Sequence, residues 1–206
     1  MDSRKPHADV LKDFVKEVFF PGMVIVEIGC GNSTLGTGAS LARDGNWKYY
    51  SIDNDASRMD IVSRQFEQVP YLQGRVEFII DDSIRGLQRV VDELDRIDLL
   101  FSDGMGNALR CFREFAMVEH LLTHDGAMVL IDNAVLSHSY NPLGRKGRVL
   151  VPYLESHPRW EVEDHPDWGD FMILATRRND GQNHAPEEFG IHPEDWELTL
   201  AEEIKR

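Results

Sequence analysis

The chain has 206 residues, 42% of them apolar, and its 36 acidic and 22 basic residues give a formal charge of −14. This length and apolar content fit one globular domain, and no segment approaches the roughly 20 apolar residues that cross a bilayer. An acidic surface repels phosphate backbones, so we do not expect nucleic acid as a partner. The polar N-terminus lacks a signal-peptide core, and Cys30 and Cys111 lack metal-ligand spacing, so we expect reduced thiols and a cytoplasmic location.

Short apolar runs alternate with helical patterns along the chain. A helix is expected near residues 6–19, and apolar runs at 23–28, 47–52, 76–80, 97–101 and 127–131 have the character of buried parallel strands. Helical segments lie between them, around 34–44, 56–69, 84–94 and 107–122. Residues 160–163 and 171–176 fit a final pair of strands joined by a turn. The alternation predicts an α/β fold with a mostly parallel, right-handed wound sheet.

An acidic residue lies at or just beyond the end of each of the first five expected strands. Ligands of open α/β sheets bind beyond the carboxyl ends of the strands. We therefore expect five side chains to line one rim of the sheet: Glu27, Asp53, Asp82, Asp103 and Asp132.

The first strand ends in a glycine-rich turn at residues 27–34. Gly29 and Gly31 allow a sharp turn and a close approach of the backbone to a ligand. A dinucleotide motif needs a third glycine where this chain has Thr34, and it would set a pyrophosphate near Glu27, which is repulsive. S-adenosylmethionine has no phosphate and carries a sulfonium and an ammonium group, which suit a carboxylate. The turn therefore favours S-adenosylmethionine over NAD.

Two further strand ends fit the same cofactor. Asp53 comes about 20 residues after the glycine turn, the spacing expected of a carboxylate that binds ribose hydroxyls. Asp82 and Ser83 end the third strand, where the adenine amino group would bind. The alternative is that Asp53 caps the helix near Ala56 and that Asp82 or Ser83 caps the next helix.

Residues 20–178 resemble a class I S-adenosylmethionine-dependent methyltransferase. The resemblance implies a Rossmann-like, seven-stranded, mostly parallel sheet with helices on both faces and antiparallel sixth and seventh strands. It implies a methyltransferase domain at 1–178, followed by an acidic tail at 179–206. The residues that it implies for cofactor binding are Glu27, Gly29, Gly31, Ser33, Asp53, Asp82, Ser83 and Asp103.

A second group of polar residues follows the fourth and fifth strands. Asp103 closes the fourth, and Asp132 and Asn133 close the fifth. Two carboxylates and an amide oxygen suit Mg²⁺, and the sequence shows no His or Cys beside them that would favour zinc. The arrangement resembles metal-dependent O-methyltransferases of the catechol and caffeoyl-coenzyme A types, in which these positions hold the metal. The alternative is that Asp103 only borders the cofactor pocket, while the Asp-Asn pair forms a turn.

The chain departs from that family at the general base. The catechol-type enzymes carry a lysine three residues after the first metal aspartate, and this chain has Gly106 there. His138 and Lys146 are the alternative proton acceptors, alongside a catalytic role for Asp103. The basic run at residues 144–148 is expected to be a solvated loop, and the alternative is that it steers an anionic substrate. Residues 134–148 as a whole are expected to form a lid or a substrate loop.

Together these features predict an S-adenosylmethionine-dependent, Mg²⁺-assisted O-methyltransferase of a small hydroxylated molecule. A metal-independent methyltransferase of the same fold is an alternative, as are an NAD-dependent oxidoreductase and a non-catalytic cofactor-binding module. For the tail at 179–206, the interpretations are a peripheral helix near Pro193 or a segment that packs on a partner subunit in a homodimer.

Overall fold

A computed structural model describes residues 6–41, 45–104, 107–134, 146–169 and 171–178. The strands are β1 (Val24–Ile28), β2 (Lys48–Asp53), β3 (Val76–Ile80), β4 (Leu99–Ser102), β5 (Met128–Ile131), β6 (Trp160–His165) and β7 (Met172–Arg177). The helices are α1 (His7–Val18), α2 (Asn32–Ser40), α3 (Ala56–Glu67), α4 (Ser83–Glu93), α5 (Ala108–Val118), the 3-10 turn η1 (Glu119–Leu121) and α6 (Gly147–Ser156).

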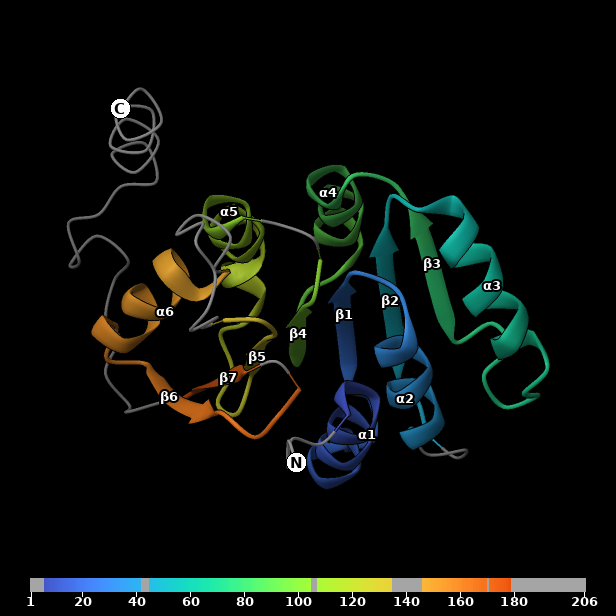
Figure 1. The fold of residues 1–206 in the computed structure, drawn as a ribbon, viewed down its shortest axis with the longest axis horizontal. Coiled ribbons are helices and arrows are strands. Elements are labelled where there is room, and N and C mark those ends of the chain that lie inside the picture. Colours follow the sequence, from blue (N-terminus) through green and yellow to red (C-terminus); the bar gives the residue numbers. More distant parts are fainter. Residues whose placement is uncertain (1–5, 42–44, 105–106, 135–145, 170, 179–206) are drawn as a thin grey trace.

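All seven strands form one sheet, in the order β3-β2-β1-β4-β5-β7-β6 (Figure 1). The first five are parallel to one another, and β7 lies between β5 and β6, antiparallel to both. The order of the parallel strands reverses between β1 and β4, and such a switch point is where open α/β sheets bind ligands. The predicted seven-stranded, mostly parallel architecture is confirmed.

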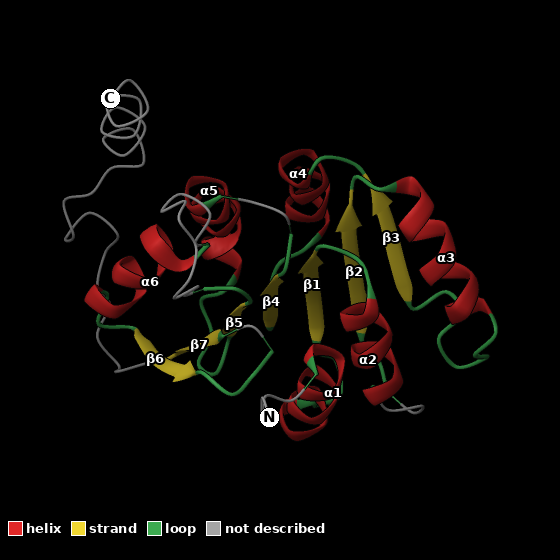
Figure 2. Ribbon diagram, viewed as in Figure 1, coloured by secondary structure: helices red, strands yellow, loops and turns green. Residues whose placement is uncertain are grey.

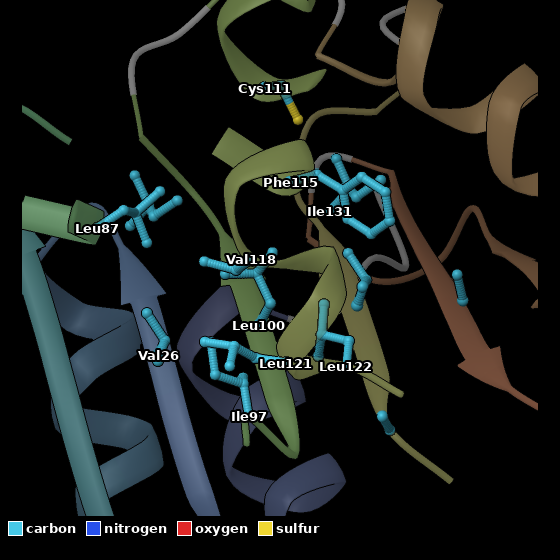
Figure 3. Close-up of a cluster of buried hydrophobic side chains, with 14 of the residues drawn as sticks. Val26, Leu87, Ile97, Leu100, Cys111, Phe115, Val118, Leu121, Leu122 and Ile131 are labelled. Carbon is cyan, nitrogen blue, oxygen red and sulfur yellow. The ribbon is translucent and has the colours of Figure 1, made fainter. Parts of the chain in front are cut away.

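Helices cover both faces of the sheet (Figure 2). The core on one face joins the sheet to α4, α5 and α6, and the core on the other joins it to α1 and α3. Figure 3 shows part of the first core, where Leu87 of α4 and Phe115 and Val118 of α5 lie among strand residues such as Val26 and Leu100. The central strands β1, β4 and β5 are buried along their whole length, because both of their faces are covered.

One helix was not predicted from the sequence. Residues 147–156 form α6, so part of the basic run predicted to be a solvated loop begins a helix instead. Lys146 and Gly147 are buried, and a Cβ on Gly147 would come within 2.9 Å of the Ala134 carbonyl oxygen. The prediction of a solvated loop is therefore wrong for residues 146 and 147, since close packing against the turn after β5 excludes solvent there. The predicted lid at 134–148 falls mostly at 135–145, outside the described residues.

Over the described ranges, no helix combines the length and the apolar character needed to cross a membrane. The acidic tail at 179–206 lies outside the described residues.

Candidate functional site

Backbone hydrogen bonds extend the parallel ladder one residue beyond the strand ends. In each case the first residue after a strand donates its N–H to the carbonyl of the last residue of a neighbouring strand or, for Ile52, of the last residue but one. These bonds hold the turns that follow β1, β3, β4 and β5 at one level, so that the residues predicted from separate strands meet on one edge of the sheet. They are Gly29 N to Ile52 O (2.8 Å), Asp81 N to Asp53 O (3.1 Å), Asp103 N to Ile28 O (2.8 Å) and Asp132 N to Ser102 O (3.1 Å).

A cavity of about 380 Å³ opens at this edge, within the range of small-molecule sites. Five of its lining residues were predicted for the cofactor: Gly29, Asp53, Asp82, Ser83 and Asp103. The rest of the lining is Ile28, Ile52, Asn54, Asp55, Arg58, Asp81, Gly104, Arg110 and Glu114.

Asp53 is held in place by the backbone around it. Its Oδ2 accepts a hydrogen bond from the Cys30 amide at 2.8 Å, and its Oδ1 accepts one from the Asp55 amide at 2.8 Å. The cap of α3 is Asp55, whose side chain accepts from the amides of Ser57 and Arg58. The alternative that Asp53 caps this helix is therefore wrong, and Asp53 instead ties the glycine turn after β1 to the end of β2.

Asp82 combines the two roles that the sequence left open, and Ser83 has one of them. Asp82 caps α4 by accepting from the Ile84 amide, and both residues also line the cavity. The Arg110 side chain donates hydrogen bonds to Asp82 and, at 3.0 Å, to the Ser83 hydroxyl. The hydrogen bond from Arg110 to Asp82 lowers the pKa of Asp82. Ser83 also donates to Glu114, whose pKa is raised by burial. Arg110 and Glu114 were not predicted; their spacing of one turn on α5 is common to many helices.

Glu27 does not line the rim, which corrects the prediction. The side chain is fully buried, and its carboxylate accepts hydrogen bonds from Ser33 (2.8 Å), Thr34 (2.6 Å), Tyr49 (2.7 Å) and Ser51 (3.0 Å). Burial raises the pKa of Glu27, and the hydrogen bonds oppose the rise. Because Glu27 lies within β1 rather than after it, its side chain turns into the core and ties β1 to α2 and β2.

Ser33 and Gly31 also lie off the cavity lining. Ser33 is buried, with its hydroxyl turned to Glu27. Gly31 has no atom within 4 Å of where a Cβ would stand, and its amide donates to the Thr34 hydroxyl at 2.9 Å. The space beside Gly31 is therefore open.

The predicted metal residues lie together, and a histidine joins them. His7, at the start of α1, lies with Nδ1 at 3.7 Å from Asp103 Oδ2 and Nε2 at 3.6 Å from Asp132 Oδ1. Asn133, in the left-handed region at φ 54°, donates its side-chain amide to Asp132. The expectation of a group without histidine is therefore wrong. The sequence did not indicate His7, because it comes from a helix about a hundred residues away and belongs to no recognisable motif.

This group has the donor chemistry of a cation site. The side chain of Asp132 is only 4% exposed, and its Oδ1 accepts no hydrogen bond in the described part of the structure. A buried carboxylate oxygen left without a donor is costly, and a cation removes that cost. Burial raises the pKa of Asp103 to about 8, with Asp132 adding to the rise and Lys146 opposing it. The residues present fit a divalent ion.

Of the two candidate proton acceptors, Lys146 lies at the site. Its side chain is 6% exposed, its Nζ lies 3.6 Å from Asp103 Oδ1, and it donates to the Ser102 carbonyl at 3.3 Å. The lysine thus comes to the first predicted metal aspartate from the start of α6 rather than from the turn after β4. His138 and Gly106 lie outside the described residues.

The model of a family described as a methyltransferase domain matches residues 26–134, more than half of the chain. The chain belongs to this methyltransferase family. The match covers the glycine turn, the strand-end acids and the Asp132-Asn133 pair, and it sets aside the NAD-dependent oxidoreductase. No curated protein matches the methyltransferase.

Solved structures show the same fold. An O-methyltransferase from Bacillus cereus in complex with SAH is 20% identical, with a TM-score of 0.68 over 83% of this chain and 80% of that one. The O-methyltransferase TomG from Streptomyces achromogenes, in complex with SAM, is 18% identical, with a TM-score of 0.67 over 83% and 79%. A methyltransferase from Geobacter sulfurreducens is 19% identical, with a TM-score of 0.63 over 83% and 77%.

Proposed function

We propose that this methyltransferase transfers the methyl group of S-adenosylmethionine to a hydroxyl oxygen of a small molecule, with the help of a divalent metal ion. The observation that carries the proposal is the double position of Asp103. It lines the cavity on one side and faces His7 and the Asp132 cluster on the other. A methyl donor in the cavity and an acceptor held at the cluster would therefore be neighbours.

The cavity lining supports a nucleoside-bearing donor. Asp53 at the end of β2 offers a carboxylate to ribose hydroxyls, and Asp82 and Ser83 offer polar groups to an adenine edge. The cavity wall is also rich in carboxylates, which suits a cationic sulfonium better than a pyrophosphate. The neighbours from Bacillus cereus and Streptomyces achromogenes, which were solved with SAH and SAM, support the same donor.

Methyl transfer is an in-line displacement in which a carbon–oxygen bond forms and the carbon–sulfur bond breaks. The electron pair of the broken bond stays on sulfur, and the hydroxyl proton goes to a base. The chain must align oxygen, carbon and sulfur and exclude water. Bound at Asp103 and Asp132, a metal ion would supply the acidity that ionises the acceptor hydroxyl. Among the described residues, we assign the role of proton acceptor to Lys146, buried beside Asp103, which takes the proton as its free amine and becomes the ammonium.

The test measures donor binding and turnover separately. We expect the protein to bind S-adenosylmethionine in calorimetry and to methylate members of a panel of vicinal diols and phenols. A chelator should abolish the methylation, and adding a divalent ion should restore it. Asp53→Ala should lose donor affinity. Asp132→Ala should keep donor affinity and lose turnover, whereas Asp60→Ala, an exposed aspartate on α3, should change neither.

Two results would contradict parts of the proposal. Full turnover in the chelator, or in Asp132→Ala, would favour the metal-independent methyltransferase. Donor binding without turnover on any hydroxylated acceptor would favour a non-catalytic module.

A further inference from the structure

The cluster at the ends of β4 and β5 contains a nitrogen donor that an Asp-Asp-Asn site lacks. His7, Asp103 and Asp132 each offer one ligand atom, and these three atoms all lie within 4.8 Å of one another. Two ligand atoms that each lie about 2.1 Å from one ion are separated by about 3 to 3.5 Å. Nδ1 lies 3.7 Å from Asp103 and Nε2 lies 3.6 Å from Asp132. Each distance is close to that value, and since one ion binds only one ring nitrogen, one of the two distances applies to a bound ion.

The surroundings hold the imidazole against the two carboxylates. The His7 ring meets the Phe101 ring edge-on, with 5.6 Å between centroids. On another side, Gly169 in the turn between β6 and β7 has no side chain. A Cβ there would stand 3.5 Å from both Asp132 Oδ1 and the His7 ring. The helix, two strand ends and this turn therefore border the group, in which Asp132 is buried while His7 and Asp103 are partly exposed.

An independent observation points to a ligand. Asp132 is 3% exposed as a residue, and its Oδ1, the oxygen directed at the cluster, accepts no hydrogen bond within the described ranges. Its other oxygen is taken by the Asn133 amide. A buried carboxylate oxygen in this state is stabilised by a cation, and the cluster offers two further ligand atoms to hold one.

We infer that His7 is a metal ligand and that the site prefers a transition-metal dication, such as Mn²⁺, over Mg²⁺. Carboxylate and amide oxygens suit Mg²⁺, but imidazole nitrogen suits first-row transition ions. One ring nitrogen binds the ion, while the other keeps its carboxylate neighbour, which fixes the orientation of the ring. Three protein ligands leave open positions for acceptor oxygens. This inference deepens the metal part of the proposed function, but ion binding can be measured without methyl transfer.

The experiment titrates the full chain with Mn²⁺ and follows the ion by electron paramagnetic resonance. Pulsed measurements on bound Mn²⁺ detect a directly coordinated ¹⁴N nucleus. We expect a ¹⁴N coupling in the wild type and its loss in His7→Gln, with Mn²⁺ affinity falling about tenfold or more. We also expect excess Mg²⁺ to displace Mn²⁺ more readily from His7→Gln than from the wild type.

Two further variants separate ligation from folding. His120→Gln removes an exposed histidine from η1 and should keep the ¹⁴N coupling. His7→Asp restores a ligand that is an oxygen, so it should recover Mn²⁺ affinity without ¹⁴N coupling and bind Mg²⁺ better than the wild type does.

Three results would overturn the inference. The first is tight Mn²⁺ binding without ¹⁴N coupling, which would mean an all-oxygen site. The second is a coupling that persists in His7→Gln, which would assign the nitrogen to another histidine. The third is an absence of Mn²⁺ binding in the wild type. In that case, measurements of S-adenosylmethionine binding and of turnover without metal would still show whether the protein is a methyltransferase of hydroxylated molecules.

Discussion

Gly29, directly after β1, is the residue at which we expect the edge of the sheet to be least tolerant of a side chain. Its φ is +98°, and a Cβ would stand 2.7 Å from the carbonyl carbon and oxygen of Asp103 and 2.8 Å from the Gly104 amide. All three atoms belong to the backbone of the turn after β4, so no side-chain rotation relieves the contact. Gly29→Ala must therefore displace one of the two turns that border the cavity.

The cost has two parts. A non-glycine residue in a left-handed conformation costs about 1 to 2 kcal/mol, and an overpacked contact adds about 1 to 3 kcal/mol. We expect Gly29→Ala to lower the free energy of unfolding by about 3 kcal/mol in total. For a domain of this size, about 3 kcal/mol lowers Tm by about 6 to 12 °C. Because Asp103 moves with its turn, S-adenosylmethionine affinity should fall as well.

Gly31→Ala is the matched control. A Cβ there meets no atom within 4 Å, and we expect Tm to change by no more than about 2 °C. Calorimetric melting and titration with S-adenosylmethionine on both variants test the pair. If Gly29→Ala melted like the wild type, the close approach of the two turns would be wrong. If both variants lost stability equally, the distinction between Gly29 and Gly31 would be wrong.

Two further predictions concern buried groups. Glu27→Ala leaves four hydroxyl groups without their acceptor and should lower the free energy of unfolding in urea by about 3 kcal/mol. The control Glu67→Ala, at an exposed position, should leave urea unfolding unchanged. Equal unfolding midpoints for the two variants would contradict the role of Glu27 in tying β1 to α2 and β2. Burial raises the pKa values of Cys30 and Cys111 to about 11, so at pH 8 about 0.1% of each thiol is ionised, against about a quarter at an ordinary pKa near 8.5. Iodoacetamide should therefore label the native protein about two hundredfold more slowly than the urea-unfolded chain, and comparable rates would show that the thiols are not buried.

Local patterns determined the order of elements and the edge of the sheet that carries the site. Buried parallel strands are continuous apolar runs because helices cover both of their faces, so β1, β2, β4 and β5 stand out in the sequence. The run at β3 was predicted as a buried strand too, but β3 is at the edge of the sheet and only its Ile79 is buried. The carboxyl ends of parallel strands share one edge, and for that reason Asp53, Asp82 and Asp103 could be predicted to meet around one cavity.

Tertiary packing alone decided which way the side chains at that edge face. Glu27 lies within β1, which is buried on both faces, so its side chain is in the core, whereas a residue after the strand end reaches the rim. No motif shows this difference in position. Lys146 and His7 reach Asp103 from the starts of α6 and α1. Their sequence distance from the strand ends is set by loop and helix lengths rather than by any local spacing. Sequence periodicity records which elements are buried, but contacts between distant elements depend on how helices dock on the sheet, and only the folded chain determines that docking.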